Sequence, residues 1–227
     1  MNFKFNRLLL ASLMVIANTV LAQMPSFKVV PLGVMGGIDE SNLSAYMVAP
    51  YTSNNYICLD AGTLHHGIEK AIENKVFKLT PEQVLKHYVK GYFISHSHLD
   101  HLSRLIINSP EDTAKIIYAN AACIKVFKNN YFTWKAWANF GNEGKKPMLN
   151  KYRYQVLTPG TEVNVEQTEL KVQAFPLSHS NLQSTAFLIN SNSNYLLYLG
   201  DTGPDEIEKS QNLKWLWQTI APLIKAG

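Results

Sequence analysis

The sequence predicts a layered α/β protein, in which sheets and helices pack as separate layers around a hydrophobic core. In the first half, short apolar runs typical of buried strands alternate with helix-forming stretches. In the second half, hairpin patterns dominate, with apolar and polar residues alternating on either side of short turns. The chain has 227 residues, of which 46% are hydrophobic and 17% charged, which suffices for one domain with a substantial core.

The first half is expected to follow the order β-β-β-α-α-β-α-β-α. Its strands are expected at residues 27–34, 44–49, 55–59, 90–95 and 115–119. Its helices are expected at residues 64–75, from Thr80 onward, at residues 102–108 and from an Asn120 cap to about residue 128. Thr80 is the expected N-cap of its helix, because Pro81 suits the first turn and Gln83 stands three residues after the cap.

The second half is expected to begin at Tyr154 and to consist mainly of hairpins. Residues 155–157 lead to Thr158-Pro159-Gly160, and the expected strands are residues 163–165, 170–178, 185–189 and 195–199, with an Asn/Ser turn between the last two. His179 stands just past one of these strands and Asp201 just past another. A final amphipathic helix is expected at residues 213–225.

Three histidines and an aspartate stand within six positions, directly after the apolar run of residues 92–94: His96, His98, Asp100 and His101. Imidazole nitrogens and carboxylate oxygens are the ligands of zinc and similar divalent ions. In an extended loop His96 and His98 point the same way, whereas the two later residues follow where the chain turns into a helix. The loop therefore predicts a two-metal site of the kind that attacks phosphate esters or amides. The alternative is a polar loop whose histidines cap backbone groups, which we disfavour because chance rarely produces this spacing.

The H-x-H-x-D-H spacing at residues 96–101 resembles the central motif of the metallo-β-lactamase-fold hydrolases. The longer run of residues 96–110 resembles the signature of the class II cyclic-nucleotide phosphodiesterases, which continues with aliphatic residues and ends in Ser-Pro or Ser-Ala. One position departs from it: Arg104 stands where that family has Gly or Ser, and is expected to crowd the helix packing or reach toward the site. The resemblance implies a metallo-β-lactamase-like αββα sandwich, with its second half incomplete.

The resemblance also implies a set of ligands for two divalent metal ions. These ligands are His96, His98, Asp100, His101, His179 and Asp201. The first ion is expected to take His96, His98 and His179. The other two loop ligands are expected to bind the second ion, with the later aspartate bridging both. Ligand type favours zinc, and manganese or iron are the alternatives.

Roles other than metal binding are expected for Asp100, Asp60 and Gly200. The resemblance implies that Asp100 is the catalytic residue, which would orient a hydroxide and pass a proton to the leaving group. Asp60 ends a predicted strand, and is either the carboxylate that holds a ligating histidine by its second ring N–H or a turn residue beside Gly62. Gly200 is expected to let the backbone come close to the site.

The activity that the resemblance implies is hydrolysis of 3′,5′-cyclic nucleotides, such as cyclic AMP or cyclic GMP, to nucleoside 5′-monophosphates. The partner would be a small cyclic nucleotide. Two alternatives stay open: another hydrolase of the same fold (a lactonase, thioesterase or β-lactamase), or a secreted metal-binding protein without activity. No histidine follows His179, so the expectation is a C-terminally truncated form that lacks the family's last strand and last histidine motif.

The segment at residues 131–140 concentrates aromatic side chains: Tyr131, Phe132, Trp134, Trp137 and Phe140. One hypothesis is a lid whose aromatic rings stack on a purine base. The other is an insertion that buries its own aromatic residues against the domain. We favour the second.

Residues 1–22 have the layout of a secretory signal peptide, since Lys4 and Arg7 precede an apolar run and cleavage suits the Ala22–Gln23 bond. A transmembrane anchor is the alternative, but the apolar run is shorter than the about 20 residues that a span needs. We therefore expect a secreted or periplasmic protein without a stable membrane anchor. Its folded domain would be residues 23–227.

Charge, cysteines and the remaining histidines point to no additional partner. The formal net charge is +4 and no basic run occurs, so no nucleic-acid polymer is expected. Cys58 and Cys123 lie in apolar stretches and are expected to be buried free thiols rather than a disulfide. His65 and His66 are adjacent on a predicted helix and face different ways, so we expect them on the surface or beside the site rather than as ligands.

Overall fold

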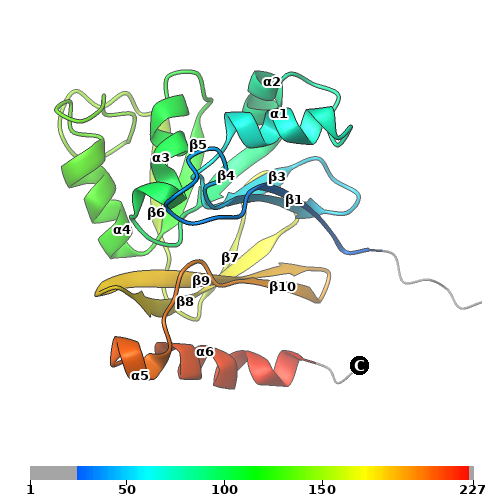
Figure 1. The fold of residues 1–227 in the computed structure, drawn as a ribbon, viewed down its shortest axis with the longest axis vertical. Helices are drawn as coiled ribbons and strands as arrows, with labels where there is room; N and C mark the ends of the chain where they lie inside the picture. The colour runs from blue at the N-terminus through cyan, green and yellow to red at the C-terminus, as the bar shows by residue number, and fades with distance from the viewer. Residues whose placement is uncertain (1–24, 225–227) are drawn as a thin grey trace, which may run out of the picture.

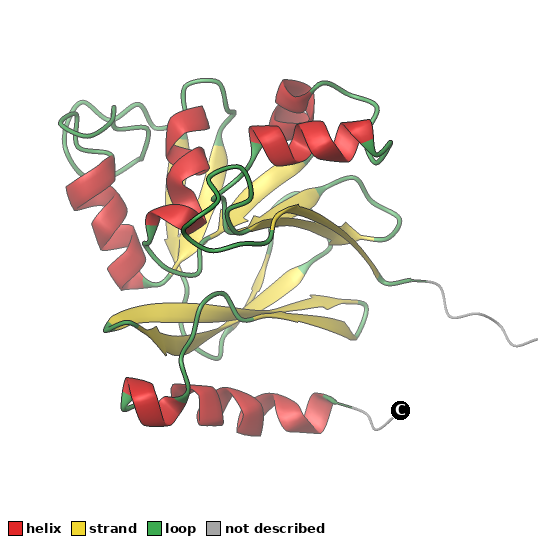
Figure 2. Ribbon diagram, viewed as in Figure 1, coloured by secondary structure: helices red, strands yellow, loops and turns green. Residues whose placement is uncertain are grey.

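The computed structural model describes residues 25–224, so the predicted signal peptide at residues 1–22 lies outside the described part of the chain. Two β-sheets lie face to face, and helices cover the outer face of each sheet (Figure 1). One sheet has six strands in the order β1-β2-β3-β4-β5-β6, and the other has four in the order β10-β9-β8-β7. The separation into helix, sheet, sheet and helix layers is plain in Figure 2 and confirms the predicted fold class.

The six-stranded sheet is built in chain order. Its strands are β1 (Phe27–Gly33), β2 (Ala45–Pro50), β3 (Tyr56–Leu59), β4 (Val89–Phe93), β5 (Lys115–Ala119) and β6 (Tyr152–Val156). The first three pair antiparallel, whereas β3 to β6 run parallel. Parallel neighbours need crossover connections, which contain α1 (His65–Glu73), α2 (Pro81–His87), α3 (Leu99–Asn108) and α4 (Ala121–Val126).

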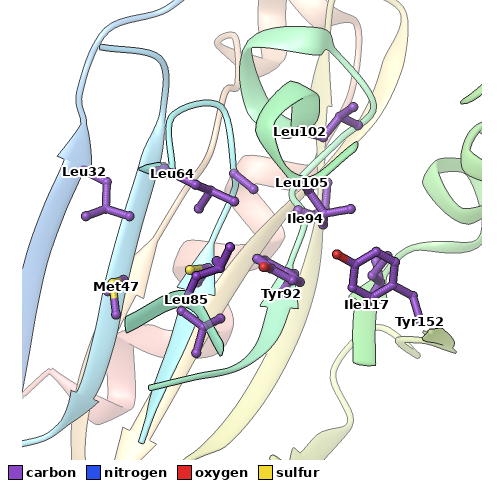
Figure 3. Packing of buried hydrophobic residues seen from close by; sticks show 14 of the residues in the cluster. Leu32, Met47, Leu64, Leu85, Tyr92, Ile94, Leu102, Leu105, Ile117 and Tyr152 are labelled. Atoms are coloured by element: carbon purple, nitrogen blue, oxygen red, sulfur yellow. The ribbon is translucent and has the colours of Figure 1, made fainter. Parts of the chain in front are cut away.

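Both faces of this sheet are buried, which explains why its strands read as continuous apolar runs. Met47 packs in the cluster between the sheet and its helices (Figure 3), whereas its neighbour Val48 packs between the two sheets. Cys58 and Cys123 are buried and free, as predicted. Within residues 25–224, no helix combines the length and apolar character that crossing a bilayer requires.

The caps of two helices follow the sequence prediction. Thr80 Oγ1 accepts a hydrogen bond from Gln83 N, and Gln83 Oε1 accepts one from Thr80 N, which completes a capping box at the start of α2. Asn120 Oδ1 accepts from Cys123 N at the start of α4. The helix then passes into a single π-helical turn, η1 (Phe127–Tyr131).

Strand β6 corrects the expectation that the second half begins at Tyr154. It pairs parallel with β5 at the edge of the first sheet. A strand's own sequence does not reveal its partner, and the β5–β6 crossover here is long because it contains the aromatic segment. That segment buries Phe132 and Phe140, while Trp134 and Trp137 remain 45% and 36% exposed.

The four-stranded sheet confirms the predicted hairpins. Its strands are β7 (Glu162–Asn164), β8 (Lys171–His179), β9 (Leu182–Ser191) and β10 (Asn194–Tyr198). The turn at Asn192 and Ser193 has φ values of 50° and 63°, the left-handed geometry that suits a two-residue hairpin.

Two helices follow this sheet, α5 (Asp205–Glu208) and α6 (Asn212–Ile220). Leu216 and Ile220 of α6 pack on Phe175 and Leu177 of β8. The α-helix ends at Ile220 rather than continuing to residue 225, because Pro222 has no N–H to donate; the chain forms a short 3-10 turn, η2 (Ala221–Leu223), instead.

Candidate metal centre

The loop between β4 and α3 carries the histidine-rich motif. β4 ends at Phe93, and α3 begins at Leu99. His98, the N-cap of α3, is extended, with φ −69° and ψ 148°. His96 is fully buried and its Nε2 lies 3.0 Å from Nδ1 of His98, as expected for alternate residues of an extended loop.

Side chains from the second sheet complete two clusters of candidate ligands. His96, His98 and His179 form the first cluster, and His96, His101 and Asp201 the second; in each, the donor atoms lie within 4.8 Å of one another. His179 is the last residue of β8, and Asp201 follows β10 by three positions. The centre therefore lies where strand ends of both sheets meet the loop.

Asp100 lies at the side of the second cluster. Its Oδ2 is 3.6 Å from His101 Nε2 and accepts a hydrogen bond from Gly37 N at 3.1 Å. The structure thus places all six predicted ligands around one point, with Asp100 outside the two tightest groups.

Asp60 is buried at the end of β3 and adopts the left-handed φ of 57°. Its Oδ1 accepts from Ser95 N at 2.7 Å, and its Oδ2 accepts from Ser95 Oγ at 2.8 Å and from His101 Nδ1 at 2.7 Å. Asp60 therefore has both of the predicted roles: it occupies a turn, and its carboxylate fixes the ring of His101.

Gly200 is required for the approach of Asp201 to the loop. Its φ is +61°, and a Cβ at this position would lie 2.6 Å from Ser95 Cβ. Any side chain here would push β10 and the metal loop apart.

The His101 ring shows that a cation fits this site. Since a carboxylate only accepts, Nδ1 donates to Asp60, while Nε2 is buried and has no hydrogen-bond partner among residues 25–224. That Nε2 lies 3.4 Å from Asp201 Oδ2 and 3.6 Å from Asp100 Oδ2, so in a neutral ring its lone pair faces two carboxylates. A positive charge between them removes the repulsion, and imidazole with carboxylate is a donor set suited to a divalent metal ion.

The charges around His101 agree with a positive charge at this position. Burial lowers the pKa of His101, but Asp201 and Asp60 together outweigh it and raise that pKa to about 10, so without a metal the ring itself carries the charge. Contact with His101 is the largest influence on Asp201 and, against the effect of burial, lowers its pKa to about 2.

His96 is held in the form that a metal ligand needs. Ser95 Oγ donates its one proton to Asp60, so it accepts from His96 Nδ1 at 3.0 Å and leaves Nε2 unprotonated. Burial, followed by the charge of His101, lowers the pKa of His96 to about 4. The ring is therefore neutral at pH 7, as metal binding requires.

Sequence reasoning missed two residues of this network, Ser95 and Tyr198. Tyr198 OH donates to Asp60 Oδ2 at 2.6 Å and lies 3.0 Å from Ser44 Oγ. Burial and the Asp60 carboxylate raise the pKa of Tyr198, so its phenol remains protonated and donates. Nothing local in the sequence joins Tyr198 to a residue 138 positions away.

His65, His66 and Arg104, which the sequence analysis also considered, lie outside the two ligand clusters. His65 and His66 are on the surface of α1, where they contact Glu82 and Glu69. Arg104 lines a cavity of about 310 Å³ together with both of these histidines, and no candidate ligand lines that cavity.

The sequence of this chain is similar to those of known proteins. Residues 26–227 match the family model described as cAMP phosphodiesterases class-II. A relative from Aliivibrio fischeri named 3′,5′-cyclic-nucleotide phosphodiesterase is 44% identical over an alignment of 217 residues, and the match covers 91% of this chain and 66% of the relative. The chain thus spans slightly less than two thirds of that relative's length.

Two solved structures show the same fold at low sequence identity. Unliganded yeast PDE1 matches with a TM-score of 0.74 and 18% identity, over 88% of this chain and 72% of that chain. YhfI from Bacillus subtilis, a metallo-β-lactamase fold protein, matches with a TM-score of 0.53 and 18% identity, over 77% and 62% of the two chains. The predicted metallo-β-lactamase-like sandwich is confirmed, and, because the family model matches nearly all described residues, the chain belongs to the class-II cAMP phosphodiesterase family.

Proposed function

We propose that this chain hydrolyses 3′,5′-cyclic nucleotides to nucleoside 5′-monophosphates at the candidate metal centre. The observation that carries the proposal is the convergence of two ligand clusters, one of three histidines and one that contains His101 and Asp201, where strand ends of both sheets meet the histidine-rich loop. Two such clusters suit two divalent ions, and membership of a phosphodiesterase family supplies the substrate class.

The side chains divide between two metal positions. His96, His98 and His179 would hold one ion; His101, Asp100 and Asp201 would hold the other, with Asp201 close enough to His179, at 3.6 Å, to bridge. When bound, two divalent ions activate water near neutral pH and offset the negative charge of a phosphodiester. Zinc suits the imidazole-rich cluster best, with manganese or iron as alternatives at the carboxylate-rich one.

The protein's own part is to orient these groups. Asp60 fixes the ring of His101, and Ser95 fixes that of His96, so both rings turn Nε2 toward the centre. Gly37 N holds Asp100 Oδ2 in place. A carboxylate held in this way can orient the attacking water, accept its proton and pass that proton to the leaving 3′-oxygen as the P–O3′ bond breaks, which is the role we assign to Asp100.

The test is a substrate panel on the purified chain supplied with Zn²⁺ or Mn²⁺. Cyclic AMP, cyclic GMP, a β-lactam and an acyl lactone are compared, and the nucleoside monophosphate product is identified by chromatography. We expect 5′-monophosphates from the cyclic nucleotides, and loss of turnover in Asp201→Asn and His179→Ala. His87→Ala is the matched control, because His87 is an exposed histidine on α2. Turnover of the lactam or lactone alone, or metal binding without any turnover, contradicts the proposal.

We also propose that the protein is exported, on the strength of the leader at residues 1–22. N-terminal sequencing of the protein from a periplasmic or culture fraction should begin at Gln23. A chain that keeps Met1 and fractionates with the cytosol contradicts export and leaves the catalytic proposal untouched.

A further inference from the structure

Tyr198 connects the two sheets at the metal centre. It is the last residue of β10 in the four-stranded sheet, whereas its hydrogen-bond partners Asp60 and Ser44 lie beside β3 and β2 of the six-stranded sheet. The ring packs against Phe187 and Tyr46, which fixes the direction of its hydroxyl. The hydroxyl therefore reaches Asp60 from the sheet opposite to the one that carries this carboxylate.

The same strand end supplies a candidate ligand. Asp201 follows Tyr198 by three residues, and its Oδ2 faces His101 Nε2 at 3.4 Å. His101 is thus approached from two sides by one segment: directly by Asp201, and through Asp60 by Tyr198.

We infer that Tyr198 is a positioning residue for the His101 side of the metal centre, a role that rests on the proposed function. Its hydroxyl holds the Asp60 carboxylate, which in turn holds the ring of His101 with Nε2 toward the cation. Packing of the end of β10 against the six-stranded sheet would then both place the Asp201 carboxylate and orient the His101 ring.

The hydrogen bonds of Asp60 Oδ2 explain why one hydroxyl matters. This oxygen accepts from Ser95 Oγ at 2.8 Å, from His101 Nδ1 at 2.7 Å and from Tyr198 OH at 2.6 Å. Without the phenol, the carboxylate loses its restraint from the second sheet and retains only partners from the metal loop itself and its helix. Asp60 keeps its two hydrogen bonds from Ser95, so Asp60 and His101 gain only a small freedom to shift, which weakens the ligand geometry without removing a ligand.

The experiment is calorimetric titration of metal-free protein with Zn²⁺, repeated with Co²⁺ to record its visible spectrum. Tyr198→Phe is compared with Tyr195→Phe, which removes the same atom from the same strand. Tyr195 is 42% exposed and lies among residues of α6 and η2, away from Asp60. His101→Gln identifies which binding event belongs to His101.

We expect Tyr198→Phe to weaken the His101-dependent event roughly tenfold and to change the Co²⁺ spectrum of that site, because partners behind a ligand usually contribute 10–100-fold in affinity. The event at His96, His98 and His179 should stay within about twofold, and Tyr195→Phe should change neither. Equal affinities in wild type and Tyr198→Phe overturn the inference. So does uniform weakening of both events together with a lower melting temperature of the metal-free protein, which indicates a purely structural role. If wild type binds two ions and hydrolyses cyclic AMP while Tyr198→Phe matches it, only this inference fails.

Discussion

Replacing Gly200 with alanine tests whether the two sheets must meet as closely as the metal centre requires. The new Cβ would lie 2.6 Å from Ser95 Cβ and 2.9 Å from Ser95 Oγ. Ordinary carbon contacts are about 3.5–4.0 Å, so one partner has to move by about 1 Å. Ser95 cannot yield easily, because both its N and its Oγ are bound to Asp60.

Two effects add up in this variant. Forcing a side chain into a small gap costs about 1–3 kcal/mol, and holding an L-residue at positive φ costs about 1–2 kcal/mol. Together we expect a loss of about 3 kcal/mol in the free energy of unfolding, or about 6–12 °C in melting temperature for a chain of this size. The displaced strand end carries Asp201, so metal affinity at the His101 side should also fall.

Gly160→Ala is the control that distinguishes backbone strain at positive φ from the steric clash of a new Cβ. Gly160 also has a positive φ, +74°, but its nearest neighbour to a Cβ is a Trp215 ring atom at 3.8 Å. It should lose only the about 1–2 kcal/mol of backbone strain, with metal affinity unchanged. The measurement is chemical denaturation of both variants with zinc titration in parallel. If Gly200→Ala behaves like Gly160→Ala in both assays, the close approach of the sheets is not what forms the centre.

Three other perturbations have defined outcomes. Chelation should lower the melting temperature, because ligands from both sheets share the metal and free metal at a thousandfold excess over its Kd stabilises by about 4 kcal/mol; an unchanged melting temperature argues against bound metal. Lys115→Met should lower the free energy of unfolding, measured in urea, by about 3–5 kcal/mol, because it leaves the fully buried Asp112 carboxylate without its cation. The hydroxyls of Tyr92 and Tyr152 donate to this carboxylate but cannot neutralise its charge. A loss of less than about 1 kcal/mol is inconsistent with a charged pair. Thr80→Ala should cost about 1 kcal/mol through the lost capping box, whereas Thr80→Ser should preserve it, and equal stabilities of the two variants would show that the cap contributes nothing.

The sequence predicted elements whose signals are local. The capping box of α2 and the hairpin turn at Asn192 and Ser193 depend on residues within a few positions, and both form as expected. The assignment of residues 155–157 to the second half was wrong, because strand pairing in a parallel sheet depends on a partner beyond a long crossover.

The candidate ligands divide in the same way. His96, His98, Asp100 and His101 are recognisable by their spacing alone, since six consecutive positions and one strand-to-helix turn fix their relative directions. His179 and Asp201 were assigned by resemblance to a family motif, and only the fold brings them within reach of the loop. Asp60 was left with two roles because its partners Ser95, His101 and Tyr198 are distant in sequence.

By itself, then, the sequence determined the layered α/β class and a metal-binding loop, because backbone periodicity and ligand spacing act over short distances. The tertiary structure alone decided how β10 meets the first sheet. That contact brings Asp201 to 3.4 Å from His101 and Tyr198 to 2.6 Å from Asp60. The physical reason is that hydrogen bonds and charges of this strength depend on ångström-scale placement, which only the packing of two sheets against each other provides.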